Sequence, residues 1–305
     1  MAVFTSREAL GLGLTRANLR SQRFGHVAHA LWTDEPLVGL DRLRALTKVL
    51  PDDAVFAGPS AYEIFGLPVL GSRFGPEVVV PAPGHPAQLA GVVCGVASLG
   101  DGDVVECCGL RVLAPPRLFV ASAAMLAPAD LVALGDAMLR KGLATEPVLN
   151  RALEQAARRR GVCAARWAVP LLESRVDSVP ETRLRLLVVL SGLPRPSCNV
   201  DLYDEHGRWL GRPDLLFDEY DVGVEYDGAH HYTLEQGRRD VVRNEDIRDG
   251  GTDLVIVNAL HLRYAQLCLD RIYRRLLAHG MPAPPLPPSA DPYLAALARP
   301  RPRRR

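Results

Sequence analysis

The chain has 305 residues, 48% of them hydrophobic, which is enough for two or three compact domains with cores of their own. Its 36 lysines and arginines nearly balance its 35 aspartates and glutamates, so any surface that binds nucleic acid has to be local. Six cysteines without a C-x-x-C pair argue against a structural zinc site, and no apolar run approaches the roughly 20 residues of a membrane span. We therefore expect a soluble, cytoplasmic protein.

The first segment, residues 1–70, is expected to hold short helices and a small hairpin. A first helix is expected over Ser6–Leu10, and Thr15 is a suitable N-cap for a second helix that runs to about Gln22. Alternating residues across His26–Trp32 fit a strand of a wing. Two further helices are predicted over Leu40–Leu50 and Ser60–Phe65.

The second segment, residues 71–172, changes to short β-rich runs separated by glycine and proline, followed by helical periodicity. The predicted strands are Glu77–Pro81, Gly91–Ala97, Asp103–Cys107 and Leu110–Ala114. The predicted helices are Pro116–Met125, Pro128–Lys141 and Thr145–Arg160. We interpret this segment as a small α/β connector domain without a catalytic constellation.

The third segment, residues 173–280, follows the order helix, three strands, helix, strand, helix, which predicts an α+β domain with a mixed sheet. The predicted strands are Ser197–Tyr203, Trp209–Phe217, Asp221–Asp227 and Leu254–Asn258. The predicted helices are Val179–Ser191, Leu234–Arg248 and His261–His279. The remaining residues, 281–305, are rich in proline and arginine and are expected to be disordered.

Three carboxylates lie on two of these strands. The strand period of two places Asp214 on one face of the first strand and Glu225 and Asp227 on one face of the next. They converge only if the connecting loop around Asp218–Asp221 has two or four residues, because an odd loop turns Asp214 to the other face. Acidic residues on exposed strands and a D-G turn are common, but this strand is largely apolar, where uncompensated charge is costly.

A hard divalent cation is the natural neutraliser of such a cluster, so we predict an Mg²⁺ or Mn²⁺ site formed by Asp214, Glu225 and Asp227. The imidazole of His231, four residues beyond the strand end, is a candidate for protonating a leaving oxygen or for hydrogen-bonding the phosphate. Asp240 and Arg243 lie one turn apart on the following helix, where Arg243 can clamp a phosphate while Asp240 orients it.

Glu181 has two explanations. It completes the capping box Ser178-Val-Pro-Glu181 and can pair with Arg185 at i, i+4, which accounts for it structurally. A role facing the metal is an additional possibility that these residues leave open.

The third segment resembles an actinobacterial domain of unknown function that is similar to the very-short-patch-repair (Vsr) endonucleases of the PD-(D/E)XK superfamily. The runs that carry this resemblance are VPETRLRLLVVLSGLPRP, RPDLLFDEYDVGVEYDGAHH and RRDVVRNEDIRDGG. The resemblance implies a restriction-endonuclease-like fold and a catalytic set, whose residues are Glu181, Asp214, Glu225, Asp227, His231, Asp240 and Arg243. One departure is the family's E-x-K lysine, whose place Asp227 takes here.

The first segment resembles the winged-helix domain of AbiEi-type antitoxins, through the runs SREALGLGLTRANLRSQRFGHVAHALW and SAYEIFGLP. That resemblance implies a recognition helix that carries Arg16, Arg20 and Arg23 toward DNA. An ordinary solvated helix explains the same arginines without DNA.

Two hypotheses follow for the whole chain. The first is an Mg²⁺-dependent endodeoxyribonuclease, favoured by the three intact carboxylates. The second is a non-catalytic DNA-binding regulator or antitoxin-like protein with a nuclease-like scaffold, favoured by the missing lysine and the character of the first segment. An enzyme that acts on RNA, a toxin partner and a homodimer also remain open.

Overall fold

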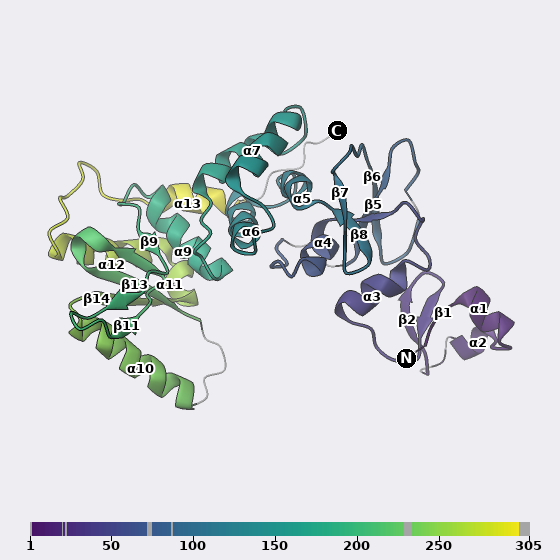
Figure 1. Ribbon diagram of the computed structural model, residues 1–305, viewed down its shortest axis with the longest axis horizontal. Helices are drawn as coiled ribbons and strands as arrows, with labels where there is room; N and C mark the ends of the chain where they lie inside the picture. Colours follow the sequence, from purple (N-terminus) through teal and green to yellow (C-terminus); the bar gives the residue numbers. More distant parts are fainter. Residues whose placement is uncertain are drawn as a thin grey trace. The chain divides into compact units, whose positions relative to one another are not determined.

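The computed structural model describes residues 2–19, 21, 23–71, 75–86, 88–228 and 234–298, without the side chains of residues 234–241. The chain divides into two compact units, Met1–Ser122 and Ala123–Arg305, and Figure 1 labels most of their elements. Each unit combines helices with sheets, so the fold is of the α+β class that the order of predicted elements indicates. No helix of the described residues is long and apolar enough to cross a membrane.

A small three-stranded sheet opens the first unit. Its elements in chain order are β1 (Val3–Thr5), α1 (Ser6–Gly11), α2 (Arg16–Leu19), β2 (Gly25–Ala28) and β3 (Leu31–Thr33). The strands pair antiparallel in the order β1-β3-β2. Thr5 and Glu8 form a capping box at the start of α1. The single strand expected over His26–Trp32 is a hairpin, because Ala30 adopts a left-handed conformation (φ 59°) that reverses the chain.

A five-stranded sheet forms the rest of the first unit, in the order β6-β5-β4-β8-β7. Its strands are β4 (Val55–Phe56), β5 (Glu77–Pro81), β6 (Val93–Ala97), β7 (Val104–Cys107) and β8 (Leu110–Leu113). The helices of this part are α3 (Gly39–Leu46), α4 (Gly58–Ile64) and α5 (Pro115–Ser122). The buried two-residue β4, which the sequence did not predict, lies at the centre of the sheet. The boundary expected at residue 70 therefore falls inside one sheet.

Helices begin the second unit. They are α6 (Pro128–Arg140), α7 (Glu146–Gln155), α8 (Val162–Ala168), the short 3-10 helix Val169–Leu171 and α9 (Val179–Leu190). Asp136 of α6 and Arg185 of α9 form a fully buried ion pair, with 2.9 Å between Oδ2 and Nη2. The boundary expected at residue 172 is thus bridged by a buried contact, and α6–α8 belong with the sheet domain that follows.

The sheet of the second unit is mixed, as predicted, with the order β14-β13-β12-β9. Its strands are β9 (Ser197–Cys198), β12 (Leu215–Phe217), β13 (Val222–Asp227) and β14 (Asp253–Asn258). Only the β13–β14 pair is parallel, and α10 (Leu234–Asp249) connects these two strands. Figure 1 shows α10 on one side of the sheet and α9 with α12 (Ala265–Ala278) on the other.

Two predicted strands are each interrupted. Ser197–Tyr203 divides into β9 and β10 (Leu202–Tyr203), because Asn199 is left-handed (φ 48°) and ends the first ladder. Trp209–Phe217 divides into β11 (Trp209–Gly211) and β12, with the segment 212–214 between them. β10 and β11 form their own antiparallel pair. Both interruptions adjoin the residues that carry the candidate site.

The C-terminal segment is partly ordered, in contrast to the expected disorder of residues 281–305. The predicted helix His261–His279 is split by Tyr264 into α11 (Ala259–Arg263) and α12, and α13 (Asp291–Ala296) follows. α13 contacts α9 and α6, and the Tyr293 side chain is 1% exposed. The expectation of disorder is wrong for this helix, because the proline-rich segment still carries apolar side chains that complete the core.

Candidate acidic site

Asp214 and Glu225 come together through the register of β12 and β13. Leu215 pairs with Val224 and Phe217 with Val222, so the same register sets Asp214 opposite Glu225, on the same face. Four residues, 218–221, connect the strands as a 3-10 turn that ends in left-handed Asp221. The even loop length on which the convergence depends is confirmed.

Asp214 is half-buried at the entrance to β12. Its Oδ2 accepts a hydrogen bond of 2.6 Å from the backbone N–H of Tyr226. Burial, followed by the negative charges of Glu181 and Glu225, raises the pKa of Asp214 to about 7, against the lowering effects of that N–H and of Arg243. The side chain thus lies in an acidic environment with one compensating cation.

Glu181 lies in the first turn of α9, close enough for its charge to raise the pKa of Asp214. Its backbone N–H donates to Oγ of the N-cap Ser178, but its own Oε2 accepts from the N–H of Asp177, at 2.9 Å. The predicted capping box is therefore only half formed. The predicted i, i+4 pair with Arg185 is also wrong, because Arg185 is committed to Asp136 in the core. Glu181 is 9% exposed, and its charge acts on Asp214.

Arg243 is the cation of the site. Its guanidinium forms an ion pair with Oε1 of Glu225 across the face of the sheet that α10 covers. Gly211 allows α10 to approach this closely, since a Cβ there would meet Ile247 Cδ1 at 2.5 Å and Arg243 Cγ at 3.2 Å. Asp240 lies one turn earlier on α10, and its side chain is outside the described residues.

Asp227 ends β13, on the Glu225 face, where its Cα partner on β14 is Asn258. No three Asp, Glu, His or Cys side chains in the described part of the chain are grouped to hold a metal ion. The predicted set of three ligands, Asp214, Glu225 and Asp227, thus stays a prediction. His231 lies outside the described residues.

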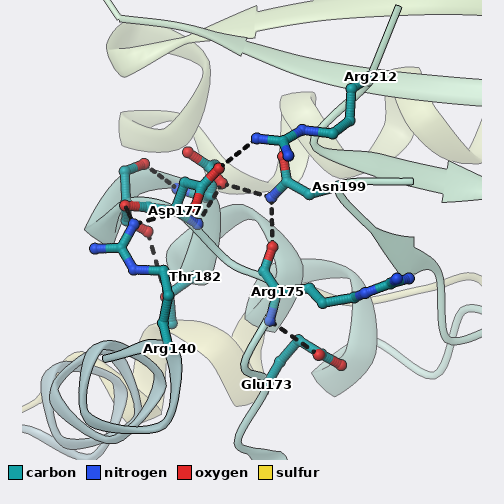
Figure 2. Close-up of polar contacts among 9 residues, drawn as sticks. Arg140, Glu173, Arg175, Asp177, Thr182, Asn199 and Arg212 are labelled. Atoms are coloured by element: carbon teal, nitrogen blue, oxygen red, sulfur yellow. Dashed lines mark hydrogen bonds and ion pairs between the residues drawn. The ribbon is translucent and has the colours of Figure 1, made fainter. Parts of the chain in front are cut away.

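The sequence did not single out Asp177 and Asn199, which bond to Glu181, or Arg140 and Arg212, which pair with Asp177; Figure 2 shows most of these contacts. Asp177 is ion-paired with Arg140 and Arg212, at 3.1 and 2.8 Å. Asn199 donates its side-chain amide to Glu181. Arg212 directly precedes Pro213-Asp214, and this proximity in the sequence was the only available signal; the others lie 15 residues or more from Asp214 in the chain.

The arginines proposed to contact DNA lie in the first unit. Arg16 begins α2, and both Arg16 and Arg23 have exposed side chains. Arg23 stacks its guanidinium 5.5 Å from the ring centroid of Phe24. Arg20 is outside the described residues.

No family model matches the chain. Two uncharacterized proteins of Mycobacterium tuberculosis, MT2308 of strain CDC 1551 and Rv2248 of strain H37Rv, are each 27% identical to it over 148 residues. That match covers 48% of this chain and 54% of each relative, so the chain spans about half the length of the curated relatives it matches. The crystal structure of the Rv2827c protein from the same organism is 16% identical, with a TM-score of 0.39 over 56% of this chain and 72% of that one.

Proposed function

We propose that the second unit is a metal-dependent endodeoxyribonuclease that hydrolyses DNA phosphodiester bonds at the acidic site. The observation that carries the proposal is the grouping of Glu181 and Glu225 around Asp214, close to Arg243. Burial, followed by the charges of these two glutamates, raises the pKa of Asp214 to about 7. Strongly perturbed carboxyl groups that are shifted by burial and by like charges are concentrated at functional sites.

The donor set fits a hard divalent cation. Asp214 and Glu225 present oxygen ligands from opposed strand positions, and their mutual repulsion is the condition that a cation relieves. Mg²⁺ commonly binds through one or two carboxylates and keeps several waters, so two protein ligands suffice, with Asp227 as the proposed third. When bound, Mg²⁺ or Mn²⁺ would supply charge stabilisation for the phosphoryl group and lower the pKa of a coordinated water.

The chain's own residues would orient the substrate. Arg243 reaches the site from α10 and carries the planar donor group suited to a phosphate oxygen. Its present bond to Glu225 would be exchanged for the phosphate when a cation neutralises that carboxylate. His231, four residues after Asp227 in the sequence, is proposed to give a proton to the leaving oxygen.

DNA binding is proposed for the first unit. The succession α1, turn, α2 and then the β2–β3 hairpin, with β1 as third strand, is the arrangement expected of a winged helix. Arg16 and Arg23 are exposed at α2 and just after it, where contacts with phosphates would be made.

The Arg243–Glu225 ion pair also supports the second candidate, a non-catalytic DNA-binding regulator. An internal cation that replaces the family's E-x-K lysine and permanently neutralises Glu225 would leave a nuclease-like scaffold without a metal requirement. Calorimetric binding of Mg²⁺ and Mn²⁺ separates the two candidates. The nuclease requires uptake that Glu225→Gln weakens, whereas the regulator takes up neither ion.

The activity test is incubation of the purified protein with supercoiled, mismatched and single-stranded DNA and with RNA, in Mg²⁺, Mn²⁺ or EDTA. The proposal expects cleavage of DNA that EDTA abolishes. Cleavage of RNA alone would reassign the substrate. If neither DNA nor RNA is cleaved under any of these conditions, the proposal of a nuclease is overturned.

A further inference from the structure

We propose that Asn199 is a positioning residue of the acidic site, which holds the carboxylate of Glu181 beside Asp214. The expected effect on cleavage rests on the proposed function, whereas the hydrogen bonds that Asn199 makes do not depend on that proposal. Figure 2 shows the Asn199 side chain and its hydrogen bond to the backbone carbonyl of Arg175.

The side-chain amide of Asn199 uses two donor contacts. Nδ2 donates to the backbone carbonyl of Arg175 at 2.6 Å and to Oε2 of Glu181 at 3.0 Å. Oε2 of Glu181 also accepts from the N–H of Asp177. With two donors on one oxygen, the rotation of the carboxylate is restricted, and bonds to an ionised acceptor are the stronger kind.

The backbone of Asn199 makes the second connection. Its N–H donates to the carbonyl oxygen of Asp214 at 3.1 Å, so one residue is bonded to both acidic positions. Asn199 makes these bonds from a left-handed conformation (φ 48°), at the point that separates β9 from β10. Asparagine, aspartate and glycine adopt that conformation most readily, but only asparagine also offers side-chain N–H donors.

The consequence is a fixed separation between Glu181 and Asp214. Glu181 of α9 and Asp214, which directly precedes β12, are far apart in sequence, and Asn199 bonds to both. A substitution that keeps the backbone turn and removes the donors should therefore release Glu181 without moving Asp214.

Two substitutions distinguish the donor role from a merely structural one. Asn199→Asp and Asn199→Gly both tolerate the left-handed backbone, and both lack the amide donors; aspartate also places a negative charge against Glu181. A structural turn alone predicts that both variants behave as the wild type. A positioning role predicts that both are impaired, and that Asn199→Asp is at least as impaired as Asn199→Gly.

The direct measurement is the side-chain amide signal of Asn199 in nitrogen–proton NMR spectra of the full chain, identified by its loss in Asn199→Gly. Glu181→Gln should move one of the two amide protons upfield, because a charged acceptor is replaced by a neutral one. Glu173→Gln is the matched control, since Glu173 lies in the same segment but bonds to the N–H of Arg175, and it should leave that proton in place. If Glu181→Gln moves neither proton in a folded variant, the positioning role is overturned.

Cleavage kinetics test whether Asn199 affects catalysis through Glu181. Asn199→Gly should lower kcat by about 10–100-fold with little change in KM, the scale of a misplaced active-site group. In a Glu181→Gln background the same substitution should cause no further loss, because Asn199 acts through Glu181. An equal loss in both backgrounds would contradict the proposal. A wild type without cleavage would instead refute the nuclease, and the NMR result would still decide the role of Asn199.

Discussion

Arg243 of α10 is ion-paired with Glu225 of β13, on the face of the sheet that also carries Asp214. The pair joins the helix to the acidic site, and the charge of Arg243 lowers the pKa of Asp214, against the effects of burial, Glu181 and Glu225. Among the described residues, the site therefore sets the guanidinium of Arg243 against the carboxylates of Glu181, Asp214 and Glu225.

Removing that guanidinium should weaken both DNA binding and cleavage. Arg243→Ala removes the guanidinium that pairs with half-buried Glu225, and a phosphate clamp acts in ground and transition states alike. We also expect the unfolding free energy to fall by about 1–3 kcal/mol in EDTA, the usual cost of removing one partner of a buried polar contact. Arg248→Ala, at an exposed position of the same helix, is the control. Equal behaviour of the two variants in cleavage and urea unfolding would contradict this role.

Asp214 should make the stability of the metal-free protein fall as pH rises. Its folded pKa of about 7 lies above the unfolded value of about 4, so the folded state holds the extra proton between these values. Stability is therefore highest below pH 4 as far as this group is concerned, and it is lost as pH rises to 7. Asp214→Asn should remove this dependence and stabilise the protein at pH 8 by about 1–2 kcal/mol.

Urea unfolding in EDTA at pH 5 and pH 8 measures the effect of Asp214→Asn. Asp218→Asn, in the exposed turn of the same hairpin, is the control. If the variant is no more stable than the wild type at pH 8, the folded environment does not disfavour the ionised form of Asp214.

Arg16 and Arg23 should contribute to the salt dependence of DNA binding. Each phosphate contact adds about 0.9 to the slope of log affinity against log salt. The double variant Arg16→Ala, Arg23→Ala should flatten that slope by about 1–2, whereas Arg151→Ala, exposed on α7 of the other unit, should not. Point substitutions are used because deleting residues 1–70 would remove β4 from the centre of the five-stranded sheet. An unchanged slope would show that α2 does not contact the phosphates.

The C-terminal helix should be needed for the stability of the second unit. Tyr293→Ala empties a buried position and should cost about 3–5 kcal/mol of unfolding free energy. Leu294→Ala, 47% exposed on the same helix, should cost far less. Thermal and urea unfolding compare the two, and a similar small loss for both would mean that α13 is not part of the core.

The sequence predicted the parts of the site that depend on local pattern. α9 and β14 lie within a residue of their expected bounds, and α10 begins at Leu234 as expected. The face shared by Asp214 and Glu225 follows from strand periodicity and an even loop. Strand periodicity and loop length can both be read from a hairpin's sequence, because the paired residues are close together in the chain.

The remainder depends on contacts between distant residues. Nothing local marks Asn199 as left-handed or bonded to Glu181, and nothing local distinguishes Arg185, paired with Asp136, from a surface arginine. The two-residue β4 is too short to show periodicity. α13 was missed because its proline-rich surroundings masked an apolar face that becomes evident only against α9 and α6.

The most direct test of the central claim combines calorimetry with gel-based cleavage for the wild type and Asp214→Asn. We expect the wild type to bind Mg²⁺ or Mn²⁺ and to cleave DNA. Asp214→Asn should lose cleavage yet keep or strengthen DNA binding, because the amide removes a metal ligand together with a charge that repels phosphate. A wild type that neither takes up metal nor cleaves DNA or RNA would contradict the account.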